Sequence, residues 1–143
     1  MNILGFHSSG NQTSVSIMID MEVNSFNCSH ERKERPDWIM FLDKVGVNRE
    51  IQLKDIDVFA FLDCQSSYTA TRTIASYLKG IATALEKPLV VIDDNSEIEL
   101  DSSDVVKLAK ENFLNANSNV DQFHPSLANP SYYLDTKYKK IND

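Results

Sequence analysis

Short apolar segments separated by polar turns occupy the first part of the chain. Asn2 to His7 is an apolar run that ends in the polar turn Ser8 to Gln12. From Thr13 to Asp20 apolar side chains alternate with polar ones, and a weaker alternation continues from Glu22 to Cys28. A period of two residues is typical of a strand with one buried face. We therefore predict three consecutive antiparallel strands at the start of the fold.

Three further segments carry apolar residues at helical spacing. The first is Ser29 to Val45, and because proline is best tolerated in a first helical turn, its regular part is expected to start at Arg35 or Pro36. The second runs from about Tyr68 to Glu86, and the third begins at residues 101–102, where an aspartate and a serine offer an N-cap. We predict one helix in each segment.

Two continuous apolar runs, Val58 to Leu62 and Leu89 to Ile92, lie between the helices. Such runs are typical of parallel strands covered on both faces. The order of elements predicts an α/β fold, a lobe of the ribonuclease-H-like or actin-like ATPase type. Its mixed five-stranded sheet would have three antiparallel and then two parallel strands, with helices on its faces.

Composition and charge narrow the classes of function. The chain has 143 residues, about the size of one domain, and its net charge of −7 offers no basic surface for nucleic acid. No apolar run approaches the roughly 20 residues of a membrane span, and the N-terminus lacks the order of a signal peptide. Cys28 and Cys64 are far apart without metal-ligand spacing, so we interpret them as free thiols. We expect a cytoplasmic protein that contacts neither nucleic acid nor membrane directly.

Acidic residues at the ends of the predicted parallel strands are the candidates for chemistry, because ligands gather at the carboxyl ends of such strands. A metal site would use Asp63, Asp93 and a third acid on the first strand, where His7 stands instead. Solvated turns are therefore the favoured interpretation of these three residues. The histidines lie in different segments, and no serine has a nucleophile motif around it. We predict no catalytic residue, no metal and no cofactor.

The turn before the second helix, Asp63 to Ser67, lies where α/β proteins often bind phosphate, but it contains no glycine. Ser66, Ser67 and Thr69 are each able to cap the helix or to help its N-terminus hold an anion. Capping alone accounts for these residue types and is the simpler interpretation.

Several motifs occur in an order that matches a known family. Residues 3–9, ILGFHSS, have the form ILAIDTS, and Ser14-Val15-Ser16 has that of the SVA-type strand that follows it. A histidine and a proline mark the first helix, as His30 and Pro36 do here. The motifs GPGSFTGxR and KGLA correspond to residues 64–72 and 79–82. Together these motifs resemble the TsaB (YeaZ) family, scaffold proteins of bacterial tRNA threonylcarbamoyladenosine synthesis once filed among glycoprotease-like (M22) peptidases.

The end of the chain fits the same resemblance. The family's late helix DAxxLLxLA corresponds to residues 101–109, and its terminal PxYLR and lysine-rich close to Pro130, Tyr133-Leu134 and residues 138–140. Between Asp94 and Glu99 most of the family's second lobe is absent. The resemblance implies a lobe at residues 1–94, with a helix and tail at 95–143 that pack back on it in place of the second lobe.

The resemblance implies a non-catalytic partner protein with an actin-like fold. Members of the family dimerise with the catalytic paralogue TsaD through their first two helices, and an ATPase, TsaE, joins the complex. We therefore expect a TsaD-like partner and a TsaE-like ATPase. The expected interface residues lie on helices one and two: Trp38, Ile39, Met40, Leu42, Thr71, Ala75, Leu78 and Ala82.

The chain departs from the family at its phosphate loop. Cys64, Gln65 and Ser66 replace the glycines of GPG, His7 replaces the strand aspartate, and Asp135 replaces the terminal arginine. These replacements argue against nucleotide binding. What is left of the loop is Ser67, Tyr68, Thr69 and Arg72.

Two other functions stay open. One is a small ribonuclease-H-like hydrolase or phosphotransferase that uses Asp63 and Asp93. The other is a homodimer that uses its helical face to bind a different cytosolic partner. Our leading hypothesis is a shortened TsaB-like scaffold that supports a TsaD-like enzyme.

Overall fold

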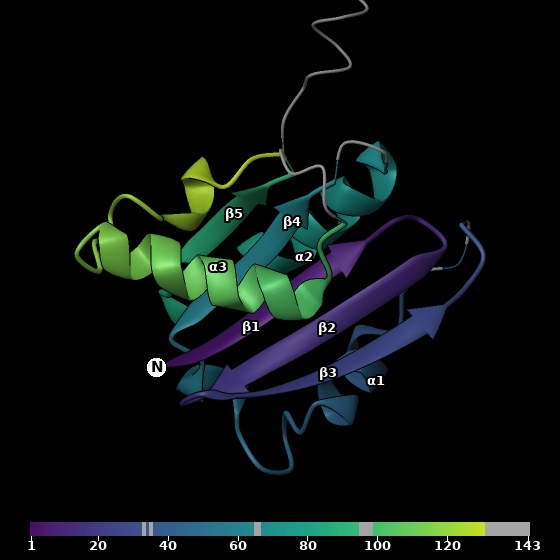
Figure 1. The fold of residues 1–143 in the computed structure, drawn as a ribbon, viewed down its shortest axis with the longest axis horizontal. Helices are drawn as coiled ribbons and strands as arrows, with labels where there is room; N and C mark the ends of the chain where they lie inside the picture. The colour runs from purple at the N-terminus through teal and green to yellow at the C-terminus, as the bar shows by residue number, and fades with distance from the viewer. Residues whose placement is uncertain (33, 35, 65–66, 95–98, 131–143) are drawn as a thin grey trace, which may run out of the picture.

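The computed structural model describes residues 1–32, 34, 36–64, 67–94 and 99–130 of the chain. Its centre is a five-stranded sheet in the order β3-β2-β1-β4-β5 (Figure 1). The strands are β1 (Asn2–Ser8), β2 (Gln12–Ile19), β3 (Glu22–Ser29), β4 (Val58–Asp63) and β5 (Leu89–Asp93).

The direction of each strand follows the predicted scheme. Strand β2 pairs antiparallel with β1 and with β3, whereas β4 pairs parallel with β1 and with β5. The two parallel connections each pass through a helical segment, as parallel neighbours require. The predicted mixed sheet of three antiparallel and then two parallel strands is confirmed.

Helices cover both faces of the sheet. Helices α1 (Trp38–Lys44) and α2 (Tyr68–Leu85) pack on one face, and α3 (Ser102–Asn115) crosses the other (Figure 1). Two 3₁₀ turns, η1 (Leu53–Asp55) and η2 (Pro125–Leu127), lie in the connections. Alternate side chains of each strand point to opposite faces, so the sheet contributes to two separate apolar clusters.

Aromatic rings fill the cluster between the sheet and helices α1 and α2. The Phe6 ring of β1 meets Trp38, Phe41 and Tyr77 edge-on, with ring centroids 5.4 to 6.4 Å apart. Edge-to-face contact is a favoured geometry for aromatic pairs. These contacts fix both helices against the first strand.

The second cluster brings α3 very close to β1. A Cβ atom added to Gly5 would lie 2.8 Å from Cγ1 of Val106, closer than side-chain carbons approach one another. Asp101 caps the helix, because its carboxylate accepts from the Asp104 N–H at 3.0 Å and the Asp104 carboxylate accepts from the Asp101 N–H at 3.0 Å. The predicted start of this helix is confirmed.

The first helix begins later than the sequence pattern predicts. Strand β3 continues to Ser29, which pairs with Gln12, and α1 begins at Trp38. Asp37 supplies the cap, since its carboxylate accepts from the Met40 N–H at 3.1 Å. The sheet ladder takes Ser29 from the predicted helical segment, and Pro36 lies just before the helix rather than in its first turn.

Helix α3 packs across the sheet and contacts all five strands, β3 least. Several predicted features lie outside the described residues: Gln65, Ser66, most of the 94–99 connection and the chain end from residue 131, including Asp135. In the part that is described, no helix is long and apolar enough to cross a membrane.

Candidate functional site

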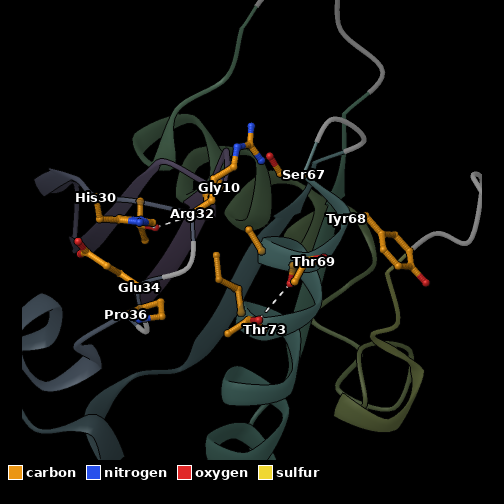
Figure 2. Close-up of a pocket in the computed structure, with 13 residues that line it drawn as sticks. Gly10, His30, Arg32, Glu34, Pro36, Ser67, Tyr68, Thr69 and Thr73 are labelled. Carbon is orange, nitrogen blue, oxygen red and sulfur yellow. Dashed lines mark hydrogen bonds between the residues drawn. The ribbon is translucent and has the colours of Figure 1, made fainter.

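A cavity of about 330 Å³ opens beside the carboxyl end of β1. The β1–β2 turn, the segment between β3 and α1 and the first turn of α2 surround it (Figure 2). Among its lining residues are Ser67, Tyr68 and Thr69, three of the four residues that the sequence marks as a phosphate-loop remnant. The remnant therefore does lie at a cavity.

Hydrogen bonds at the floor of the cavity tie the turn to the segment after β3. Ser8 Oγ accepts from the Gly10 N–H at 3.2 Å and lies 2.9 Å from the Thr13 hydroxyl oxygen. The same Thr13 oxygen lies 2.7 Å from Nε2 of His30. His30 Nδ1 donates to the Glu31 carbonyl at 2.8 Å, because a carbonyl oxygen only accepts. This network holds the wall of the cavity in place.

Gly10 forms the tight point of the β1–β2 turn. Its φ of +96° lies in the region that side chains disfavour. A Cβ atom at this position would lie 2.5 Å from Arg32 Nη1 and 3.5 Å from Ser67 Oγ. The guanidinium and the hydroxyl therefore flank the same point above the turn, as the sticks in Figure 2 show.

Ser67 occupies the N-cap position of α2, but its side chain makes no capping hydrogen bond. Its Oγ is buried and has no hydrogen-bond partner among the described residues, and the residue is only 4% exposed. The expectation that the Ser67 side chain caps the helix is therefore wrong. Thr69 does not cap either, since it lies within the helix and its carbonyl accepts from the Thr73 hydroxyl at 3.0 Å.

Arg72, the fourth remnant residue, does not line the cavity. Its guanidinium donates to the Tyr68 hydroxyl at 2.7 Å and lies 5.2 Å from the centre of that ring. Figure 2 shows the Tyr68 ring pointing away from the cavity. Among the described residues that line the cavity, the cationic side chain is Arg32 instead, and sequence reasoning missed it.

The predicted interface residues divide by burial. Five of them face the sheet and are at most 4% exposed: Leu42, Thr71, Ala75, Leu78 and Ala82. These five cannot contact a partner, which corrects the predicted surface. Small residues on α2 allow close packing on the chain's own sheet, rather than on another protein. Trp38 and Met40 are half-buried, and Ile39 is 79% exposed.

Some apolar residues of the two helices stay exposed or half-buried. The rings of Trp38 and Tyr77 stack with centroids 4.5 Å apart and planes 8° apart. Burial of Tyr77 raises the pKa of its hydroxyl above the ordinary value. Ile81, one turn beyond Tyr77, is half-buried as well. We call Trp38, Ile39, Met40, Tyr77 and Ile81 the α1–α2 surface.

The candidate metal residues do not converge. Asp63 and Asp93 are partners in the β4–β5 register and share the α2 face of the sheet. His7 points to the opposite face, toward a second cavity of about 300 Å³ with Glu99 and Asp101. Within the described residues, no group of three or more His, Cys, Asp or Glu side chains is placed to hold a metal ion.

His7 titrates in an unusual setting. Burial lowers the pKa of its imidazole below the ordinary 6.5, and the carboxylates of Asp94, Glu99 and Asp101 oppose that change. Its Nδ1 atom is buried, and no hydrogen-bond partner for it is found in the described part of the chain. His7 is therefore held mainly in its neutral form at neutral pH.

Comparison with known proteins gives a match at the level of structure. YeaZ from Pseudomonas aeruginosa has a TM-score of 0.59 and 19% identity, over 65% of this chain and 44% of that one. An uncharacterised protein described as similar to the peptidase YeaZ from the same organism has a TM-score of 0.56 and 22% identity, over 65% of this chain and 43% of that one. No family model and no curated protein sequence matches the chain.

The chain spans less than half the length of both structures. At these identities the likeness establishes the fold and not the activity. The strand order and directions described above belong to that fold. The chain thus has a YeaZ-like, α/β fold of the ribonuclease-H-like and actin-like type.

Proposed function

We propose that the chain is a non-catalytic, TsaB-like scaffold that binds and supports a TsaD-like enzyme in tRNA threonylcarbamoyladenosine modification. The YeaZ-like fold supports a TsaB-like protein in general terms. The single observation that carries the partner is Ile39, a large apolar side chain 79% exposed on a helix of seven residues. Its neighbours Trp38 and Met40 are half-buried, so each of them also leaves part of its side chain exposed.

The α1–α2 surface has the character of a protein interface. Aromatic and methionine side chains are enriched at such interfaces, and contiguous apolar patches mark them. The stacked rings of Trp38 and Tyr77 give the surface a rigid base that loses little side-chain entropy on binding. Burial of Ile39 by a partner would contribute about 1.5–3 kcal/mol.

The remaining features of the complex follow from this role. A chain with a net charge of −7 is poorly suited to grip tRNA, so the partner enzyme would hold the nucleic acid. A TsaE-like ATPase would join the assembly as a third member. We place the complex in the cytoplasm, where tRNA is modified, and assign this chain no catalytic step.

Co-purification tests the proposal. A tagged chain is expressed with the TsaD-like protein encoded in the same genome, and the modified adenosine is measured in tRNA after deletion of the gene. We expect a stable complex and a loss of the modification. If the two proteins do not bind and the deletion leaves the modification unchanged, the proposal is wrong.

The adjacent strand ends favour a second candidate, a hydrolase or phosphotransferase that uses Asp63 and Asp93, since these residues are neighbours in the β4–β5 register. Metal-dependent or ATP-dependent activity that is lost in Asp63→Asn would support it. The α1–α2 surface also suits a homodimer, because an apolar surface is able to bind a second copy of this chain as well as a different protein. Sedimentation of the isolated chain distinguishes a homodimer from a monomer that awaits a different partner.

A further inference from the structure

We propose that the cavity beside Gly10 binds the phosphoryl group of a small phosphorylated molecule, held between the Arg32 guanidinium, the Ser67 hydroxyl and the N-terminus of α2. This site does not depend on the proposed scaffold function. It lies at the end of the sheet, among residues that the α1–α2 surface does not include.

The Ser67 hydroxyl is the first reason. A buried polar group without a partner is costly, and such groups are nearly always satisfied in folded proteins. Ser67 lies at the one position from which it ordinarily caps its helix, yet Oγ bonds to nothing in the described part of the chain. A ligand oxygen at the cavity would accept a hydrogen bond from it.

The start of α2 is the second reason. Thr69 and Ala70 line the cavity and lie in the first turn, where backbone N–H groups have no acceptor inside the helix. The helix has 18 residues, and the partial positive charge at its N-terminus favours an anion. The hydroxyl and these N–H groups would therefore donate to the same ligand.

Arg32 supplies the charge. Its Nη1 lies beside the point where a Gly10 Cβ would be, so the glycine leaves room for the guanidinium next to Ser67. No hydrogen bond or ion pair of Arg32 is found among the described residues. A guanidinium matches phosphate oxygens in geometry and charge. Glu34, which also lines the cavity, opposes an anion and sets a limit on the affinity.

The size of the cavity decides the ligand class. A volume of about 330 Å³ is more than one phosphate ion fills and lies at the small end of ligand sites. Apolar and hydroxyl side chains, among them Pro36, Ile74 and Thr73, line the remainder. The phosphoryl group would occupy the Arg32 end, with the body of a small molecule over these residues.

A titration followed by amide NMR tests the site, with inorganic phosphate as the probe and chloride at equal ionic strength as the reference. We expect saturable shifts of the Gly10, Thr69 and Ala70 amides. Arg32→Gln should weaken binding about tenfold or more, since a hydrogen bond to a charged group is lost. Glu34→Gln should strengthen it. Arg49→Gln removes a cation that is paired with Asp43, away from the cavity, and should leave the phosphate affinity unchanged.

Ser67→Ala gives a signature that a structural role would not. It should weaken phosphate binding several-fold while the melting temperature without phosphate stays equal or rises, because the lost hydroxyl has no partner among the described residues. Shifts no larger than those with chloride, or equal affinity in the native chain, Arg32→Gln and Ser67→Ala, would overturn the proposal.

A second probe identifies the source of the phosphoryl group. If ribose 5-phosphate binds more tightly than phosphate and extends the shifts to Thr73, the ligand is a phosphorylated small molecule. Equal affinity for phosphate and ribose 5-phosphate would overturn the claim that the ligand is a phosphorylated small molecule and would leave free phosphate as the ligand. Ile39→Asp should not change either affinity, which separates a failure of this site from a failure of the scaffold function.

Discussion

Trp38 of α1 and Tyr77 of α2 stack their rings with centroids 4.5 Å apart and planes 8° apart. Residues that are 39 positions apart in sequence thereby join the two helices on one face of the sheet. Phe6 of β1 meets both rings edge-on beneath them. The outer surface of this face rests on a rigid aromatic base.

Removal of the stack should weaken the fold. We predict that Trp38→Ala lowers the free energy of unfolding by about 2–4 kcal/mol, because a large half-buried ring and its contacts with Phe6, Phe41 and Tyr77 are lost. Ile39→Ala, one residue along the same helix, should change it by less than about 0.5 kcal/mol, since that side chain is mostly exposed. Urea unfolding of both variants checks this. If Trp38→Ala and Ile39→Ala lose the same free energy of unfolding, the Trp38–Tyr77 stack does not stabilise the fold.

Gly5 should not tolerate a side chain. Gly5→Ala places a Cβ 2.8 Å from Val106 Cγ1, and we predict a loss of about 1–3 kcal/mol in the free energy of unfolding. Gly80→Ala is the matched control, because nothing lies within 4 Å of its Cβ position and it is inside α2. This control should gain about 0.5–1 kcal/mol. Calorimetry that ranks the two variants in the reverse order would contradict the packing of α3 on β1.

The cap of α3 should depend on pH. Hydrogen bonds, first that from the Ser103 hydroxyl and then that from the Asp104 N–H, hold the pKa of Asp101 below its ordinary range. The stability that the ionised Asp101 cap contributes to the fold is therefore complete above about pH 4. It is lost as the pH falls through the lowered pKa of Asp101. Asp101→Ala should cost about 1 kcal/mol at neutral pH and less in acid. Unfolding curves of the native chain and of Asp101→Ala at neutral and at acid pH test this. If the variant loses the same free energy of unfolding at both, the ionised cap is not the cause of the loss.

His7 should also make stability depend on pH, over a higher range. Because burial lowers its pKa in the folded chain, the unfolded chain binds the proton more readily below about pH 6.5. Stability is thus highest above that pH and falls as the pH drops toward the lowered pKa. His7→Gln should flatten this part of the profile. An NMR titration of the imidazole with a midpoint at or above 6.5 would contradict the lowered pKa.

Local patterns predicted most of the fold. The alternation in β2 and β3, the apolar runs of β1, β4 and β5 and the spacing in α2 and α3 each follow from burial on one or both faces. The first helix was placed too early because its polar N-terminal half carries no period that separates helix from strand. The β2–β3 ladder takes Ser29, and the Asp37 cap sets the start of α1.

The site was less predictable for the same reason. Ser67 and Thr69 were correctly placed at a helix start, but the cavity also needs Gly10 and Arg32, which come from other parts of the chain. A glycine in the polar turn after β1 was the available clue. The small residues of α2 led to a wrong prediction of a partner-binding face. Ala75 and Ala82 suit close packing on any neighbour, and here that neighbour is the chain's own sheet.

The most direct test of the scaffold function is the affinity of the TsaD-like enzyme for three forms of this chain, measured by calorimetric titration. Ile39→Asp adds a carboxylate to the α1–α2 surface, whereas Met21→Asp adds one at a residue that is equally exposed, 80% against 79%, in the turn between β2 and β3. We predict that Ile39→Asp binds at least about tenfold more weakly, because burial of an unpaired charge is costly, and that Met21→Asp binds like the native chain. Equal affinity for all three forms, or no binding by the native chain, would contradict the account.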